Sequence, residues 1–246
     1  MEPSSILKLA FLGLNTLVTA PVVVAVAALD QNRSYHVAQI WARLNLLAFG
    51  VSVRTRRLAP LDPSQPYVFM SNHRSHLDVL AAMAALEEFQ LRWVAKKELT
   101  NVPVFGWALR HTGHVIIDRS NHEQAIASLR AARAQMLDGV SVIIFPEGTR
   151  APTDDELLPF KKGGFMLALE TGFPVVPMAV RGSRRLLPKG SRSVAAGEID
   201  LVIGAPIAVD RIDRDTLMAR VREFMVVHAG ARPEPIPVRG LATEAM

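Results

Sequence analysis

The sequence of 246 residues contains no cysteine, and only three tryptophans and two tyrosines. The absence of cysteine excludes disulfides, thiolate metal ligands and a cysteine nucleophile. The few tryptophan and tyrosine residues do not lie among the basic residues, so the stacking surface of a single-stranded nucleic-acid binder is not expected. The sequence therefore predicts no nucleic-acid partner.

Net charge is also modest, but the positive charge is clustered. Lys and Arg number 28 and Asp and Glu number 23, which gives a formal net charge of +5. The basic clusters are Arg54, Arg56 and Arg57, and then Arg181, Arg184, Arg185, Lys189 and Arg192. Such clusters favour phosphate-bearing partners, such as anionic lipids or phosphorylated substrates.

Half of the residues are hydrophobic, and residues 9–29 contain no charge. As a helix this segment spans roughly 30 Å, about the hydrocarbon core of a bilayer. Three interpretations stay open: a cleaved signal peptide that uses Lys8 and residues 25–27, a transmembrane anchor, or a membrane-embedded helical hairpin, because Pro21 weakens a continuous helix. The arginines that follow this segment predict that the rest of the chain lies on the cytoplasmic side.

From residue 51 onwards, strand-like and helix-like segments alternate, which predicts an α/β fold with a mostly parallel central sheet flanked by helices. The predicted strands are residues 51–58, 67–70, 91–95, 114–117, 140–145, 175–180 and 199–203. The predicted helices are residues 35–50, 75–89, 102–110, 122–137, 163–170 and 214–228. We therefore expect an N-terminal membrane-associated helical segment (residues 1–50), an α/β domain (residues 51–228) and a loosely ordered tail (residues 229–246).

Three of the predicted strands are followed directly by polar residues. His73, Arg119 and the run of residues 147–150 each come just after an apolar strand. In open α/β sheets, ligands bind outside the carboxyl ends of the strands. We therefore expect these side chains to face one crevice.

His73 and Asp78 are candidates for a catalytic pair. On a single helix they would lie about 140° apart and could not meet. If His73 lies in a turn before Ser75 caps the helix, Asp78 in the first helical turn can reach back to it. The dyad would remove a proton from a hydroxyl without a nucleophilic Ser or Cys. The alternative is that Asp78 only caps the helix and that His73 is a turn residue.

The run Glu147, Gly148, Thr149 and Arg150 offers ligand groups for a phosphorylated substrate. Gly148 lets the backbone approach a ligand closely, and the side chains of Thr149 and Arg150 can donate hydrogen bonds to a phosphate. Glu147 can accept from a ligand hydroxyl, and Arg119 is a further phosphate candidate. The alternatives are a polar turn and a surface Arg119 paired with its neighbour. A metal site is not expected, because the two histidines near Asp78 straddle the predicted helix start.

Together these motifs resemble the lysophosphatidate (1-acylglycerol-3-phosphate) acyltransferases of the larger glycerolipid acyltransferase family. The matching residues are Asn72, His73 and Asp78 of an N-H-x-x-x-x-D block, Gly113, Ile117 and Arg119 of a second block, F-P-E-G-T-R at residues 145–150, and a proline-containing strand at residues 176–178. The second block departs from the family at Ile116, which replaces the usual aromatic residue. The resemblance covers about residues 67 to 182.

The resemblance implies that His73, held by Asp78, deprotonates a glycerol hydroxyl, which then attacks the thioester of an acyl-CoA or acyl-carrier protein. Arg119, Glu147 and Arg150 are expected to hold the phosphorylated acceptor, with help from Lys96 or Lys97. Neither a metal nor an organic cofactor is implied. A membrane location with the catalytic domain on the cytoplasmic face fits a lipid acceptor and product.

Other functions stay open. The same chemistry can serve another lysophospholipid or a lyso-ornithine lipid, and the chain can instead be a lipid hydrolase or a non-enzymatic protein that binds anionic lipid. The basic residues between Arg181 and Arg192 are either a solvated or membrane-surface patch, or they contact the phosphates of CoA or an acidic carrier protein.

Overall fold

The computed structural model describes residues 2–117 and 122–231 of the chain. Its strands are β1 (Val51–Arg57), β2 (Val68–Ser71), β3 (Leu91–Lys96), β4 (Val115–Ile117), β5 (Ser141–Ile144), β6 (Val175–Arg181) and β7 (Gly197–Ile203). Its helices are α1 (Pro3–Ala27), α2 (Gln31–Phe49), α3 (Leu77–Ala85), the 3-10 helix η1 (Lys97–Asn101), α4 (Phe105–His111), α5 (His122–Leu137), α6 (Gly163–Thr171), α7 (Ser183–Leu186) and α8 (Arg214–Ala229). The predicted tail falls largely on residues 232–246, which lie outside the described residues.

The strands form one sheet in the order β1-β7-β6-β2-β5-β3-β4. All neighbouring pairs are parallel except β6 and β7, which are antiparallel. The predicted mostly parallel sheet is therefore confirmed. Because β2, β5, β3 and β4 are consecutive neighbours and run in the same direction, their carboxyl ends share one edge of the sheet.

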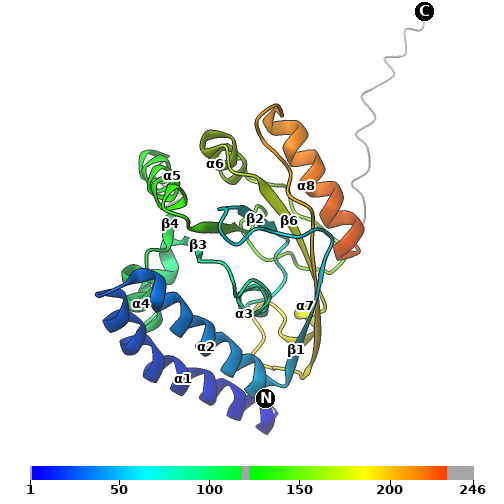
Figure 1. The fold of residues 1–246 in the computed structure, drawn as a ribbon. Helices are drawn as coiled ribbons and strands as arrows, with labels where there is room; N and C mark the ends of the chain where they lie inside the picture. Colours follow the sequence, from blue (N-terminus) through cyan, green and yellow to red (C-terminus); the bar gives the residue numbers. More distant parts are fainter. Residues whose placement is uncertain (1, 118–121, 232–246) are drawn as a thin grey trace, which may run out of the picture.

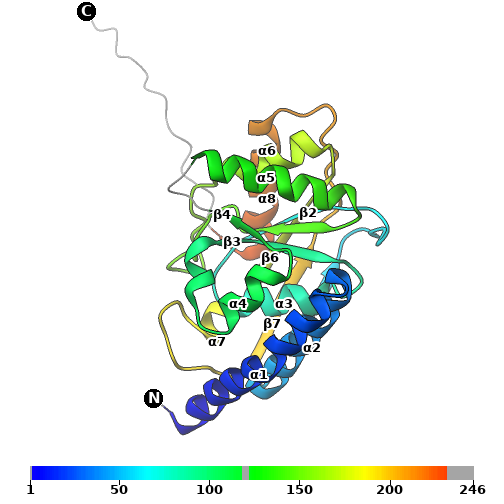
Figure 2. The ribbon, with the colours of Figure 1, turned by 90° about the vertical axis from the view of Figure 1, so that its left-hand side faces the viewer.

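Helices cover both faces of this sheet (Figures 1 and 2). Helices α5, α6 and α8 lie on one face, and α3 lies on the other with the α1–α2 pair outside it. The position of β2 between two layers of helices explains why its sequence is continuously apolar. Val68 and Met70 pack on the side of α5, α6 and α8, whereas Phe69 packs on the side of α3. All three side chains are inaccessible to solvent, as expected for a parallel strand buried on both faces.

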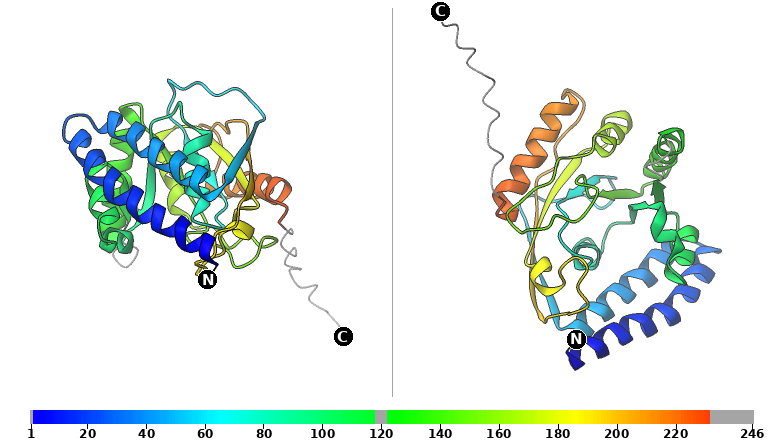
Figure 3. Two further views of the ribbon diagram at one scale, coloured as in Figure 1. Left: turned by 90° about the horizontal axis from the view of Figure 1, so that it is seen from below. Right: turned by 180° about the vertical axis from the view of Figure 1, so that it is seen from behind.

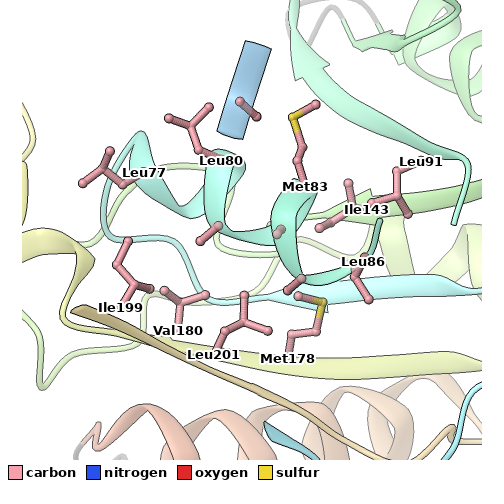
Figure 4. Close-up of a cluster of buried hydrophobic side chains, with 14 of the residues drawn as sticks. Leu77, Leu80, Met83, Leu86, Leu91, Ile143, Met178, Val180, Ile199 and Leu201 are labelled. Carbon is pink, nitrogen blue, oxygen red and sulfur yellow. The ribbon is translucent and has the colours of Figure 1, made fainter. Parts of the chain in front are cut away.

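Helix α3 is fixed by apolar packing on strands β6 and β7. Figure 4 shows the strand side chains directed at α3, whereas Leu80 and Met83 of α3 lie on its other side. The residues of this buried cluster drawn there include Leu77, Leu80, Met83, Leu86, Met178, Val180, Ile199 and Leu201. A helix of nine residues is too short to be stable alone in water. Each fully buried Leu or Met side chain contributes about 1.5–3 kcal/mol relative to exposure. The packing therefore gives α3 a defined position, and its first turn carries Asp78.

The N-terminal segment forms a helical hairpin in which α1 and α2 lie side by side (Figures 1 and 3). Pro21 lies inside the continuous helix α1, so the interruption expected at this proline does not occur. The chain turns instead just before α2, where the Asp30 carboxylate accepts from Asn32 N at 2.8 Å and from Arg33 N at 3.1 Å. Asn15 Nδ2 donates to the carbonyl oxygen of Trp41 at 3.2 Å, which fixes the pairing of the helices.

Arg92 of β3 ties the start of α2 to the sheet. Its guanidinium donates to Asn32 Oδ1 at 3.0 Å and to the carbonyl oxygens of Leu91 and Gln31 at 3.0 and 3.3 Å. The group also lies over the ring of Tyr35, 5.9 Å from its centroid. Arg92 is only 2% exposed, so its removal would leave these buried acceptors without a donor.

We predict that Arg92→Met lowers the free energy of unfolding by about 1–3 kcal/mol, because buried acceptors lose their donor. Arg43→Met on α2 is the matched control. Its ion pair with Glu87 is half exposed and contributes about 0–1 kcal/mol. Thermal unfolding in detergent measures both changes. Equal effects of the two substitutions would contradict the structural role of Arg92.

Candidate active site

Asn72 fixes the point at which the chain leaves strand β2. Its fully buried side-chain amide donates to the carbonyl oxygen of Val180 at 2.9 Å and accepts from the N–H of the same residue at 2.8 Å. An amide side chain supplies one donor and one acceptor at the same time, which is what this stretch of β6 backbone needs. The carboxyl end of β2 is therefore joined to β6 immediately before His73.

His73 and Asp78 form the predicted contact. His73 Nδ1 lies 2.8 Å from Asp78 Oδ2, and the same oxygen accepts from Arg74 N at 2.6 Å and Ser75 N at 2.8 Å. Ser75 Oγ in turn accepts from Leu77 N at 3.2 Å, which is a reciprocal cap of α3. The two alternatives drawn from the sequence thus coincide, since Asp78 caps the turn and also holds the histidine.

The Asp78 carboxyl is completely buried. Burial alone raises its pKa, but the hydrogen bond and the charge of His73, together with the Ser75 N–H, outweigh burial and hold the pKa below its usual value. Its place in the first turn of α3 also favours negative charge. With an ionised carboxylate as acceptor, Nδ1 of His73 carries the proton and Nε2 is left as the basic nitrogen.

Phe145 supports the other side of the imidazole. The two rings are stacked, with 3.9 Å between their centroids and 12° between their planes. Trp93 of β3 lies against Phe145 in turn, at a centroid distance of 6.0 Å. The His73 side chain remains 15% exposed. Its orientation is therefore set by Asp78 at one nitrogen and by Phe145 on the ring face, while part of the ring stays accessible.

Glu147 lies beneath this turn. Its Oε1 accepts from the His73 N–H at 2.8 Å and its Oε2 from Leu158 N at 2.9 Å. Both oxygens also accept from Arg74, at 3.1 and 3.2 Å. Glu147 and Arg74 are each only 2% exposed, and burial raises the pKa of Glu147 while the charge of Arg74 opposes the rise. These contacts make Glu147 part of the support of His73. Its predicted contact with a ligand hydroxyl stays a prediction.

The remaining residues of the F-P-E-G-T-R run lie next to the histidine turn. Gly148 has a positive φ of 71°, which glycine adopts without strain, and Ala151 N donates to the carbonyl oxygen of His73 at 2.9 Å. Thr149 Oγ1 accepts from Lys189 Nζ at 3.4 Å. Burial lowers the pKa of the partly buried Arg150, and the charge of Asp78 acts in the opposite direction. Arg150 therefore lies within electrostatic reach of the dyad.

The other predicted ligands lie along the same edge or outside the described residues. Lys96 is the last residue of β3, where it pairs with Ile117, the last residue of β4. Lys97 begins η1 and is exposed. Arg119 lies outside the described residues. Within residues 2–117 and 122–231, no group of three or more His, Asp or Glu side chains is arranged to hold a metal ion, and the expectation that none is needed stays a prediction.

A protein-family model described as Acyltransferase matches residues 52–181, which is more than half of the chain. The chain belongs to the acyltransferase family. The family match begins in β1, ends with β6 and includes the histidine turn and the F-P-E-G-T-R run. The family predicted from the motifs is therefore confirmed.

Similar members of the acyltransferase family carry the name 1-acyl-sn-glycerol-3-phosphate acyltransferase. A chloroplastic one from Brassica napus is 32% identical over 185 residues, which cover 74% of this chain and 53% of the relative. One from Chlamydomonas reinhardtii is 30% identical over 230 residues, covering 93% and 66%. The human alpha enzyme is 33% identical over 182 residues, covering 72% and 64%. The chain thus spans about half to two thirds of the length of these relatives.

A crystal structure of the 1-acyl-sn-glycerophosphate (LPA) acyltransferase PlsC from Thermotoga maritima has the same fold. The two superpose with a TM-score of 0.78 over 92% of this chain and 93% of that one, at 23% sequence identity. The likeness extends beyond the matched domain and includes most of the N-terminal segment, because residues 52–181 alone are a smaller share of the chain.

The buried pair of Arg74 and Glu147 generates a stability prediction. Arg74→Met leaves Glu147 as an uncompensated buried charge, so we expect the free energy of unfolding to fall by about 3–5 kcal/mol. Adding Glu147→Gln removes that charge and keeps an acceptor for the His73 N–H, so the double variant should recover part of the loss. Urea unfolding of the wild type, the two single variants and the double variant measures how strongly the two substitutions are coupled. Simple additivity of the two changes would show that the pair does not interact.

Proposed function

We propose that this protein is a membrane-associated 1-acyl-sn-glycerol-3-phosphate O-acyltransferase. It transfers a fatty acyl group from acyl-CoA or acyl-carrier protein to the free hydroxyl of lysophosphatidate and forms phosphatidate. The observation that carries the proposal is the 2.8 Å contact between His73 Nδ1 and the buried Asp78 carboxylate at the carboxyl edge of the sheet. The names of the relatives support the choice of acceptor.

In the proposed reaction His73 acts as a general base. Its Nε2 takes the proton of the acceptor hydroxyl while the oxygen attacks the thioester carbonyl. The carbon–sulfur bond of the resulting tetrahedral intermediate then breaks, and the thiolate leaves with the proton returned by His73. Asp78 stabilises the imidazolium that exists between these two steps. The acceptor supplies the attacking oxygen, so no covalent acyl-enzyme is needed.

The acceptor phosphate is assigned to the basic groups around the dyad. Arg150 offers two parallel donors to a phosphate, and Thr149 adds a hydroxyl. Lys96, Lys97 and Arg119 complete the set that the sequence predicts. Glu147 acts on this site through the backbone of His73. Lys189, in contact with Thr149, is the member of the second basic cluster best situated for the phosphates of the acyl donor.

The membrane attachment is assigned to the α1–α2 hairpin. Helix α1 is long and apolar enough to cross a bilayer, but Lys8 Nζ donates to the carbonyl oxygen of Val194 at 3.0 Å and Trp41 Nε1 to Thr16 Oγ1 at 3.0 Å. A separate spanning helix would lose these bonds to the rest of the chain. The exposed large apolar side chains of the hairpin are Ile6, Leu7, Phe11, Leu14, Leu17, Val18, Val22, Leu29, Ile40, Leu44 and Leu47. This surface fits a hairpin that lies in one leaflet, with the catalytic domain on the cytoplasmic face.

We predict that His73→Ala lowers acceptor-dependent thiol release by at least about 10²-fold, the usual contribution of a general base. The assay follows free thiol from oleoyl-CoA with and without lysophosphatidate. His76→Ala is the control, because His76 is exposed and has no role in the proposed reaction.

The other outcomes of this assay identify the alternatives. Thiol release without any acceptor indicates a lipid hydrolase, and no release with CoA or carrier-protein thioesters indicates a protein that only binds anionic lipid. Competition by glycerol 3-phosphate analogues separates a phosphate-bearing acceptor from a lyso-ornithine lipid, which has no phosphate for Arg150 to hold.

We predict that the double substitution Leu14→Ser and Leu17→Ser lowers binding to lipid vesicles at least about tenfold, because each inserted leucine contributes about 1.5 kcal/mol or more. The matched control is Leu137→Ser with Val227→Ser, which changes two exposed aliphatic residues on α5 and α8. Co-flotation with vesicles measures the bound fraction. An equal loss in both double variants would contradict attachment through the hairpin.

A further inference from the structure

The Asp78 carboxylate has one oxygen that the dyad does not use. Oδ2 accepts from His73 and from two backbone N–H groups, whereas Oδ1 is buried and accepts no hydrogen bond from the described part of the chain. A buried carboxylate oxygen without a donor is costly, and such groups are uncommon in folded proteins. A donor is therefore expected close to Oδ1.

Ser183 carries a hydroxyl that matches this requirement. The residue begins α7, is completely buried, and its Oγ has no hydrogen-bond partner among the described residues. Helix α7 packs on α3, which carries Asp78. Ser183 is also among the groups that lower the pKa of Asp78, although the structure itself forms no hydrogen bond between the two side chains. A buried unpaired donor and a buried unpaired acceptor thus lie on two elements that pack against one another.

The backbone on either side of Ser183 is hydrogen-bonded to Asn72 and Ser75, which belong to the same turn as His73. Three residues before the start of α7, Val180 is joined by both backbone groups to the side chain of Asn72. At the other end of α7, Leu187 accepts from Ser75 Oγ at 2.7 Å, and its N–H donates to the Ser183 carbonyl oxygen. The position of Ser183 relative to Asp78 is therefore fixed at both ends of the α7 segment.

Gly182 makes the turn that delivers the hydroxyl. It has a φ of 85°, and a Cβ on this residue would lie 2.9 Å from the carbonyl oxygen of Glu198 in the neighbouring strand. Both constraints require glycine at this position. The chain can therefore leave β6 and enter α7 within one residue, which brings Ser183 onto the α3 face of the sheet.

We propose that Ser183 is a positioning residue of the acyl-transfer reaction, whose hydroxyl donates to Asp78 Oδ1. This bond would stop the carboxylate from rotating about its Cβ–Cγ bond, so that Oδ2 stays directed at His73 Nδ1. It also stabilises the charged form of Asp78 as His73 becomes protonated. The inference rests on the proposed general-base role of His73 and adds a third member to that arrangement.

The test measures thiol release by Ser183→Ala. A hydrogen bond to a charged group corresponds to a change of about ten- to a hundredfold, so we expect kcat to fall by that factor, with KM for lysophosphatidate changed by less than about twofold. Ser183→Thr keeps the hydroxyl and should recover most of the activity. Ser128→Ala is the matched control, since it loses a hydroxyl bonded to the Ile116 carbonyl oxygen and lies on α5, which covers the face of the sheet opposite α3.

A double-mutant cycle separates positioning from packing. In an Asp78→Asn background, Ser183→Ala should lower the remaining kcat by less than about twofold, because the bond acts through the carboxylate. An equal fold-loss in both backgrounds would overturn the proposal. If the alanine variant does not fold, Ser183→Cys keeps the side-chain volume with only a weak donor and should show the same kcat loss.

A spectroscopic readout distinguishes this proposal from the proposed function. The low-field proton resonance of His73 Nδ1–H, assigned by its absence in His73→Ala, should shift in Ser183→Ala and stay unchanged in Ser128→Ala. If the wild type showed no acceptor-dependent thiol release but the resonance still shifted in Ser183→Ala, the proposed function would be refuted and the Ser183–Asp78 contact would be supported. A His73-dependent enzyme with unchanged kcat and resonance in Ser183→Ala would refute the contact alone.

Discussion

The buried carboxylate of Asp78 is the interaction on which the site depends. It lies in the first turn of α3 and receives the backbone N–H groups of Arg74 and Ser75 as well as the imidazole of His73. A charge in this position would be unfavourable without such donors. The five-residue spacing of His73 and Asp78 therefore has a structural consequence that does not depend on catalysis, because it lets a helix cap and a histidine contact share one oxygen.

The F-P-E-G-T-R run, residues 145–150, contributes two residues that support this turn. Phe145 stacks on the His73 ring, and Glu147 binds the His73 N–H from below while Arg74 neutralises it. Two strand ends that are adjacent in the sheet, those of β2 and β5, thus build one rigid unit. The side chains of Thr149 and Arg150, in the outer part of the run, are partly exposed, as the proposed contact with a substrate phosphate requires.

The sequence predicts elements whose signal is local and misses features that depend on distant partners. The apolar strand before Asn72 and the helix cap at Ser75 can be predicted from the sequence, because the apolar run and the capping residues each lie within a few residues of one another. By contrast, β7 enters the sheet between β1 and β6 and runs antiparallel to β6, which no local pattern encodes. Helix α3 ends at Ala85 rather than near Phe89, since apolar residues continue into the core after the helix has ended.

The same distinction applies to the site. The His73–Asp78 pair follows from spacing and chemistry, but Arg74 and Ser183 resemble ordinary polar residues of a turn and a basic segment. Their roles arise from burial against Glu147 and Asp78, which requires the fold. For Glu147, an acid after a strand suggests a ligand contact, which stays a prediction, whereas its contacts with the His73 N–H and with Arg74 could be seen only in the fold.

The hairpin and the dyad are joined through one loop, the segment between α7 and β7. Val194 in this loop accepts from Lys8 and donates to Ser5 Oγ at 3.0 Å, whereas Leu187 accepts from Ser75 beside the dyad. Arg92 adds a second attachment, from the sheet to the start of α2. Because both ends of the hairpin are bonded to the α/β domain, a hairpin attached to a leaflet as proposed would hold the carboxyl edge of the sheet at a fixed height relative to the bilayer. The proposed reaction on a membrane lipid would need that constraint, since the acceptor hydroxyl would lie at a nearly constant depth and His73 would have to meet it there.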